Sequence, residues 1–169
     1  LMYILYAGIV VVESRRNGTQ KMSPWDRGLL LPAGFDVPKE DRIDISISSM
    51  DEVVELSRKV HSFCESHGCD GRRACHMSLA VEEMARNIVQ HGFPHDKRKH
   101  SVEVRVLKKG EDYVLRIWDD CFIFDPVGQL TMFSDDDLKH HFGLRLIIRI
   151  AKEVRYTSIL KLNNLYVRI

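Results

Sequence analysis

The feature that most constrains the fold of this chain is a pair of alternating segments in its second half. Val102, Val104 and Val106 alternate with charged residues, and the same two-residue period returns over residues 113–117. The residues between them, 108–112, have the sequence Lys-Lys-Gly-Glu-Asp, a composition typical of a turn. Two such segments predict an antiparallel hairpin with one buried face. A second layer of structure must therefore cover that face.

Two amphipathic segments upstream would supply this layer. Apolar residues recur at helical spacing over residues 53–63 and again over residues 74–88. The first segment opens with a capping box at residues 49–52, and His67-Gly68 supplies its stop. We therefore predict two consecutive helices, the second beginning near Asp70.

The remaining elements complete the expected architecture. An alternating strand is predicted over residues 43–47, a polar loop over 127–141, a third helix over 144–154, and a closing hairpin around Asn163-Asn164. We expect an α+β two-layer sandwich, in which a mixed, mostly antiparallel sheet is covered on one face by about three helices.

Composition limits the classes of function. Lys and Arg total 25 against 24 for Asp and Glu, a net charge of +1, so no large basic surface points to nucleic acid. The 44% hydrophobic content supports a folded core. The four cysteines, Cys64, Cys69, Cys75 and Cys121, form no C-x-x-C pair. With nothing that marks a secreted chain, we expect reduced thiols in a cytoplasmic domain.

The N-terminal region has two interpretations. Residues 1–12 are apolar and uncharged, and a polar stretch with several basic residues follows. The segment is shorter than the roughly 20 residues that span a bilayer. It is either the end of a transmembrane helix that tethers the protein to the inner face of the membrane, or a strand or helix packed on the domain. Residues 13–41, broken by Gly and Pro, are predicted as a linker, and residues 42–169 as the domain.

Within the second predicted helix, Glu83, Asn87 and His91 follow one another at four-residue intervals. Because a helix advances about 100° per residue, they share one stripe beside the apolar seam, where a helix lines a pocket. An exposed polar ladder is the alternative, although such a face would more naturally offer Lys or Arg beside Glu. A carboxylate serves as a base toward a hydroxyl or water, and an amide oxygen suits Mg²⁺.

Three segments together resemble a known family. Glu83-x3-Asn87-x3-His91-Gly92 resembles the N-box of the GHKL, or histidine-kinase-like, ATPase superfamily. Residues 119–126, Asp-Asp-Cys-Phe-Ile-Phe-Asp-Pro, resemble the Asp-x-Gly-x-Gly-Phe-Asp-Pro box of its anti-sigma-factor serine/threonine kinases, which act in bacterial partner-switching systems. Residues 141–144, His-Phe-Gly-Leu, resemble the Gly-x-Gly-Leu box of the same kinases. The resemblance covers roughly residues 42–169 and implies the histidine-kinase-like ATPase fold.

The resemblance also implies roles for single residues. Glu83 matches the base that activates a serine hydroxyl or water, and Asp119 matches the carboxylate that accepts from the adenine amino group. Asn87 matches the Mg²⁺ ligand. Gly143 and Leu144 match the helix N-terminus near the phosphates, where free N–H groups favour anions. The implied nucleotide-binding set is Asn87, His91, Asp119, Cys121, Ile123, Gly143 and Leu144.

The function implied is a regulatory domain that binds ATP and Mg²⁺ and phosphorylates a protein partner, a sigma factor or an anti-anti-sigma-like protein. Members of the family often dimerise, so a homodimer is also implied. The sequence departs from the family at Cys121, Ile123 and His141, where the family has glycine. Glycine permits φ > 0 and a close approach to a ligand.

Two outcomes of these departures stay open. The backbone takes an ordinary conformation there, or the nucleotide sits differently because Phe122 and Ile123 fill part of the adenine space. The second outcome favours a non-catalytic or weakly ATP-binding protein-interaction module of the same fold, acting as the cytosolic tail of a membrane protein.

Overall fold

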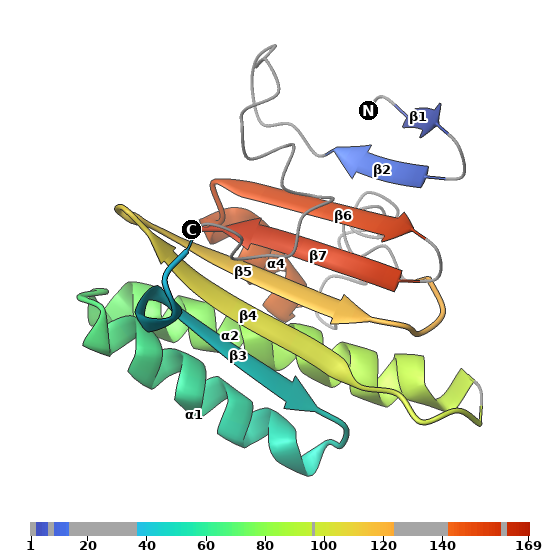
Figure 1. Ribbon diagram of the computed structural model, residues 1–169, viewed down its shortest axis with the longest axis horizontal. Coiled ribbons are helices and arrows are strands. Elements are labelled where there is room, and N and C mark those ends of the chain that lie inside the picture. The colour runs from blue at the N-terminus through green and yellow to red at the C-terminus, as the bar shows by residue number, and fades with distance from the viewer. Residues whose placement is uncertain (1–2, 7–8, 14–36, 96, 124–141, 160–161) are drawn as a thin grey trace.

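In the computed structural model, the two alternating segments are neighbouring strands of an antiparallel sheet (Figure 1). β4 (Val102–Lys109) and β5 (Asp112–Asp119) pair along their whole length, from Val102 opposite Asp119 to Lys109 opposite Asp112. Gly110 lies in the turn with a φ of +60°, a conformation that glycine adopts without strain. The structure describes residues 3–6, 9–13, 37–95, 97–123, 142–159 and 162–169.

The sheet has seven strands in the order β1-β2-β6-β7-β5-β4-β3, and every pair of neighbours is antiparallel. The strands outside the central hairpin are β1 (Tyr3–Tyr6), β2 (Ile9–Glu13), β3 (Arg42–Ile47), β6 (Glu153–Ile159) and β7 (Leu162–Arg168). A short 3-10 turn, η2 (Lys39–Asp41), leads into β3.

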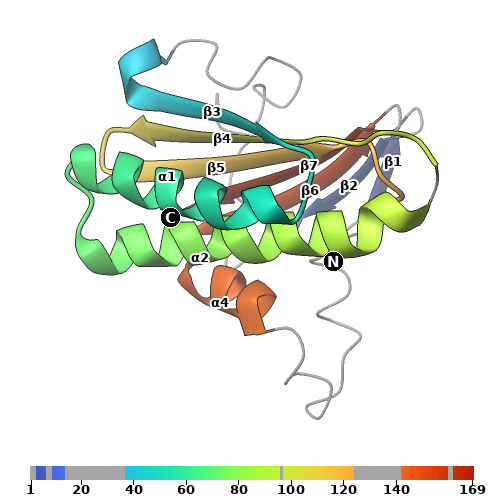
Figure 2. The ribbon, with the colours of Figure 1, turned by 90° about the horizontal axis from the view of Figure 1, so that it is seen from below.

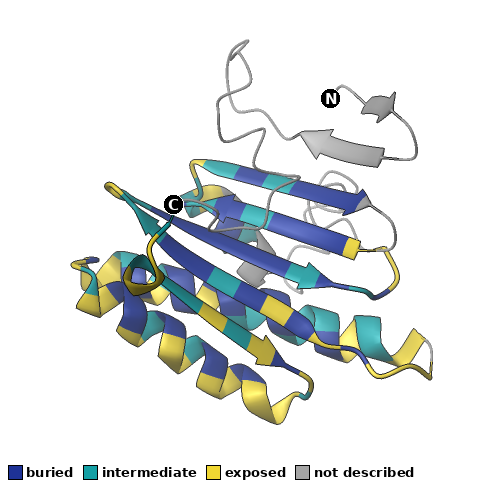
Figure 3. Ribbon diagram, viewed as in Figure 1, coloured by how far each residue is buried: buried dark blue, intermediate teal, exposed yellow. Residues whose placement is uncertain are grey.

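The three α-helices among the described residues form one layer on one face of this sheet (Figure 2). α1 (Asp51–Ser66) and α2 (Gly71–Asn87) lie side by side beneath the strands, and α4 (Phe142–Ile150) lies beside α2. The buried residues concentrate between the two layers (Figure 3). Most residues of α1 outside its buried seam are exposed, whereas the exposed residues of α2 lie in its first half. The predicted two-layer α+β sandwich is confirmed.

The local signals that start and end α1 and α2 are largely those predicted. The carboxylate of Glu52 accepts from the backbone N–H groups of Ser48 (2.6 Å) and Ser49 (3.0 Å). Ser49 Oγ donates to the same carboxylate (3.2 Å) and Met50 is the N-cap, so only the glutamate half of the capping box forms. Gly68, with φ +79°, follows the end of α1. Asp70 caps α2 by accepting from the N–H of Arg73 (3.0 Å).

Two boundaries predicted near the C-terminus are wrong. The third helix ends at Ile150, and Val154 belongs to β6, because the N–H of Lys152 turns to the carbonyl of Arg168 (2.8 Å) and opens the strand pairing. The three-residue step from Ala151 to Val154 continued the helical period by coincidence.

The Asn163-Asn164 pair is not a turn but lies within β7. Asn163 faces Asp119 of β5, and Asn164 faces Trp118. Asparagine is common in tight turns, so the local signal favoured a turn there, whereas the structure uses the pair inside the sheet.

The N-terminal segment contains two strands. β1 pairs with β2, and β2 pairs with β6, so the segment extends the sheet at its edge. Of the helices that the structure describes, none is long and apolar enough to cross a membrane. Most of the predicted linker, residues 13–41, lies outside the described residues, and that division of the chain stays a prediction.

Candidate functional site

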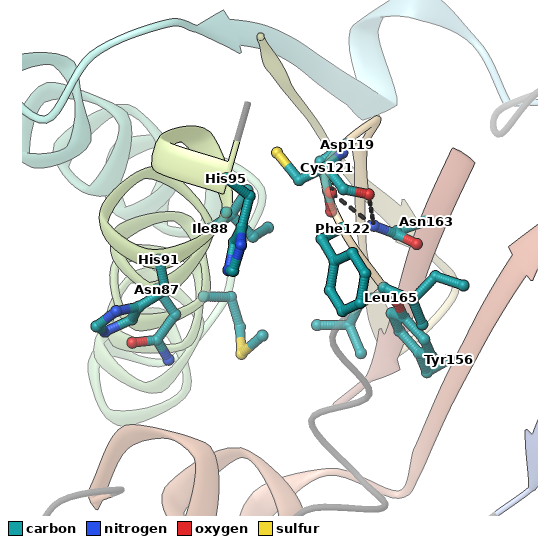
Figure 4. Close-up of a pocket in the computed structure, with 13 residues that line it drawn as sticks. Asn87, Ile88, His91, His95, Asp119, Cys121, Phe122, Tyr156, Asn163 and Leu165 are labelled. Carbon is teal, nitrogen blue, oxygen red and sulfur yellow. Dashed lines mark hydrogen bonds between the residues drawn. The ribbon is translucent and has the colours of Figure 1, made fainter. Parts of the chain in front are cut away.

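A cavity of about 250 Å³ lies between the C-terminal end of α2 and strands β5, β6 and β7 (Figure 4). Its size is near the lower end of small-molecule sites, which begin at about 300 Å³. The helix wall of the cavity consists of Met84, Asn87, Ile88, His91, Gly92 and His95. The sheet wall consists of Asp119, Cys121, Phe122, Ile123, Tyr156, Asn163 and Leu165.

The helix wall is shaped by a change in helix type. After Asn87 the α-helix continues as a π-helical turn, η3 (Ile88–Gly92), and then as a 3-10 turn, η4 (Phe93–His95). Such π turns are frequent at functional sites. Asn87 is half-buried and His91 is exposed, and neither side chain hydrogen-bonds to any residue that the structure describes. Both are therefore free to meet a ligand.

Glu83 lies one helical turn before Asn87 and is not among the lining residues of the cavity. Its carboxylate is 3.4 Å from Arg86, which also contacts Glu82 at 2.5 Å. The alternative interpretation, an exposed polar ladder, predicted Lys or Arg beside the glutamate, and Arg86 fits that expectation. The structure thus brings Asn87 and His91 of the predicted stripe to the cavity, and the role of Glu83 as a base stays a prediction.

Asp119, the last residue of β5, is the buried carboxylate of the sheet wall, with 8% of its surface exposed. Its Oδ1 accepts from the N–H of Cys121 (3.0 Å) and from Nδ2 of Asn163 (2.7 Å). Burial raises the pKa of Asp119, while the hydrogen bonds from Asn163 and Cys121 oppose that shift. The carboxylate is therefore held in one position.

Asn163 is a residue of the site that the sequence prediction missed. It is 2% exposed, and its Nδ2 also donates to the carbonyl of Cys121 (3.1 Å). Its Oδ1 is buried and has no hydrogen-bond partner within the described part of the chain. A buried acceptor without a partner costs about 1–3 kcal/mol, so a donor on a bound ligand would be favoured next to it. The signal was present in the sequence, since Asn163 continues the inward alternation of Leu165 and Val167.

The replaced glycines can be assessed at two of the three positions. Cys121 is buried, and its side chain packs on Gly92, where an added Cβ would lie 3.0 Å from both Cβ and Sγ of Cys121. Phe122 and Ile123 line the cavity but are 71% and 56% exposed, so they form its rim instead of filling it. The ring centroids of His95 and Phe122 are 5.5 Å apart. His141 lies outside the described residues.

Gly143 and Leu144 belong to the first turn of α4. Residues 124–141, which include the end of the second motif, are outside the described part of the chain. The predicted roles of Gly143 and Leu144 near the phosphates stay predictions.

The fold and the cavity agree with a comparison of the chain with protein families. The family model described as the histidine kinase-like ATPase domain matches residues 48–169. The chain belongs to this family. The resemblance to the superfamily is thereby confirmed, and membership of the family supports an ATP-binding function. A comparison with curated proteins finds no match to the chain.

Proposed function

We propose that this histidine kinase-like ATPase domain binds the adenine of Mg·ATP in the cavity and transfers the γ-phosphoryl group to a serine or threonine of a partner protein. The observation that carries the proposal is the buried pair of Asp119 and Asn163 in the sheet wall. Asp119 is a fixed acceptor, and Asn163 Oδ1 is a second acceptor beside it. An exocyclic amino group offers the donors that such acceptors need.

The residues of the helix wall fit a hard cation. Asn87 presents a neutral amide oxygen at the end of α2, and Mg²⁺ binds few protein oxygens while keeping several waters. Bound there, Mg²⁺ would neutralise charge on the phosphates, which is the main requirement of phosphoryl transfer. Asn87 would hold the ion, and the exposed His91 would lie beside the phosphates.

In the proposed transfer, Glu83 accepts the proton of the attacking hydroxyl. The hydroxyl oxygen then bonds to the γ-phosphorus, the bond from that phosphorus to the β–γ bridging oxygen breaks, and ADP leaves with the electron pair. Glu83 must turn from Arg86 for this role, and its 34% exposed carboxylate has room to do so. The partner is a sigma factor or an anti-anti-sigma-like protein by the resemblance of the motifs.

A second candidate function is a non-catalytic module that binds ATP or a protein without transferring phosphate. The contact of Glu83 with Arg86 favours it, because the carboxylate must leave this ion pair before it can meet an attacking hydroxyl. The two functions differ in turnover and not in fold, so binding and turnover must be measured separately.

The binding part is tested by calorimetric titration of the 169-residue chain with Mg·ATP. We expect binding, and we expect Asp119→Ala to weaken it by about 10- to 150-fold, the effect of a lost hydrogen bond to a charged group. Inosine triphosphate, which carries a carbonyl in place of the amino group, should bind the wild type at least about tenfold more weakly. The absence of heat with millimolar Mg·ATP would rule out the kinase and leave only a module that binds a protein.

Turnover is tested with two neighbouring glutamates that share one arginine. Glu83→Gln should retain ATP binding and lose ADP release in the presence of the partner, whereas Glu82→Gln, which also frees Arg86, should keep it. If neither the wild type nor Glu82→Gln releases ADP while ATP binds, the non-catalytic candidate holds.

A further inference from the structure

Three side chains with metal-binding chemistry meet at one end of the β4–β5 pair. Because Val102 of β4 lies opposite Asp119 of β5, the residues just before β4 and just after β5 are neighbours in space. His100 precedes β4, and Asp120 and Cys121 follow β5. One ligand atom from each of the three lies within 4.8 Å of the other two.

The geometry of this cluster is close to that of a zinc site. His100 Nδ1 and Asp120 Oδ1 are 2.7 Å apart. Zinc binds nitrogen and oxygen at about 2.0–2.2 Å and sulfur at about 2.3 Å, so its tetrahedral ligands lie roughly 3.3–3.8 Å from one another. A small separation of His100 from Asp120, and a small approach by Cys121, would reach those distances.

The surroundings hold two of the ligands in place. The side chain of His100 is 1% exposed, and its ring packs against Phe93 with 5.4 Å between centroids. Cys121 is 7% exposed, packed on Gly92, and anchored through its backbone to Asp119 and Asn163. Buried, prepositioned ligands lose little conformational entropy when an ion binds.

Asp120 connects the cluster to solvent. Its side chain is 36% exposed, and Arg98 approaches its second oxygen, Oδ2, at 3.6 Å, while Oδ1 faces His100. Arg98 also donates to the backbone carbonyl of Asp120 (3.2 Å). One oxygen of the Asp120 carboxylate thus faces the cluster, and the other faces the guanidinium of Arg98. Outer-shell partners of this kind orient the carboxylates that bind metal ions.

We propose that His100, Asp120 and Cys121 form a binding site for Zn²⁺. Imidazole nitrogen, carboxylate oxygen and thiolate sulfur are the three ligand types that zinc takes from proteins, and three protein ligands leave one position for water. The cysteine that replaces a family glycine supplies the sulfur. Cys121 also lines the cavity and contacts Asp119, whereas His100 and Asp120 are not among the lining residues.

The test is a titration of the reduced 169-residue chain with Co²⁺ and, in competition with a chromophoric chelator, with Zn²⁺. Cobalt reports a bound thiolate through its sulfur-to-metal charge-transfer band, which the other histidines of the chain do not produce. We expect one ion per chain and a charge-transfer band that is lost in Cys121→Ser. Asp120→Asn should bind zinc at least about tenfold more weakly, because loss of even an outer-shell partner lowers metal affinity by about 10- to 100-fold.

Two cysteines provide the controls. Cys75 is exposed and Cys69 is buried, and neither belongs to the cluster. Cys75→Ser and Cys69→Ser should keep the band and the zinc affinity. The proposal is overturned if the wild type binds zinc no more tightly than Cys121→Ser, or if the band disappears in either control and persists in Cys121→Ser.

Discussion

The two walls of the cavity hold their polar groups in opposite ways. On the sheet wall, Asp119 is buried and accepts two hydrogen bonds, and Asn163 donates to both Asp119 and Cys121. On the helix wall, Asn87 is half-buried, His91 is exposed, and neither bonds to another side chain in the described residues (Figure 4).

This difference separates two tasks. A base is rigid and is recognised best by acceptors that do not move, since fixed groups lose no further freedom on binding. An ion keeps part of its water shell and tolerates several positions of its ligands. The fixed sheet wall therefore suits recognition of the base, and the unpaired helix wall suits the ion and the phosphates.

The largest effect on ATP affinity is expected from removing a hydrogen bond that fixes Asp119 in the sheet wall. Asn163→Ala removes the 2.7 Å hydrogen bond to Asp119, and we expect Mg·ATP affinity to fall by about 10- to 150-fold in calorimetry, because bonds to charged groups contribute about 1.5–3 kcal/mol. Asn164→Ala is the matched control. Asn164 is the next residue of β7, it is also buried, and its amide donates to Thr157 instead. Equal losses in both variants would show that only the stability of β7 matters.

The second prediction concerns the point where the two walls touch. Gly92→Ala places a Cβ 3.0 Å from Cβ and Sγ of Cys121, and we expect the free energy of unfolding in urea to fall by about 1–3 kcal/mol, as overpacking does. Combining it with Cys121→Gly should restore most of that loss, which a double-mutant cycle measures. Gly71→Ala, where nothing lies within 4 Å of the added Cβ, should not destabilise the protein. Additive effects of the pair would contradict the contact.

These contacts mark where prediction from the sequence succeeds and where it stops. The strands around Gly110 and the helices α1 and α2 follow from hydrophobic period and turn chemistry, because each signal is local. The partners of Asp119 are not local. Asn163 lies 44 residues further along the chain, and only the pairing of β5 with β7 brings it there.

The packing of Cys121 on Gly92 has the same origin. Both residues were singled out from the sequence, Gly92 as the last residue of the N-box motif and Cys121 as a departure from glycine. Their contact depends on how the π-helical turn η3 approaches the end of β5, which no period in the sequence encodes. Local signals therefore predict which elements form, whereas tertiary pairing decides which side chains share the site.

The third prediction tests the helix wall. Asn87→Ala should weaken ATP binding about fivefold when Mg²⁺ is present, the effect of about 1 kcal/mol, and should leave binding in a chelator unchanged. Gln90→Ala is the control, since Gln90 is exposed in the same π-helical turn and does not line the cavity. An equal loss with and without Mg²⁺ would assign Asn87 to the nucleotide itself and not to the ion.

The smallest effect is expected at the rim, where the sheet wall is exposed. Phe122 is 71% exposed and lies opposite the helix wall, so its ring has only a partial contact with a bound base. Phe122→Leu keeps an apolar side chain and removes the aromatic ring. We expect about twofold weaker ATP binding, since an aromatic contact at the low end of its range contributes about 0.5 kcal/mol. Calorimetric titration with Mg·ATP measures the affinity of this variant. Leu162→Ala is the control, since Leu162 is an exposed apolar residue that does not line the cavity. Tighter binding in Phe122→Leu would mean that the ring competes with the base for the cavity, and the fixed sheet wall would then be partly closed to its own ligand.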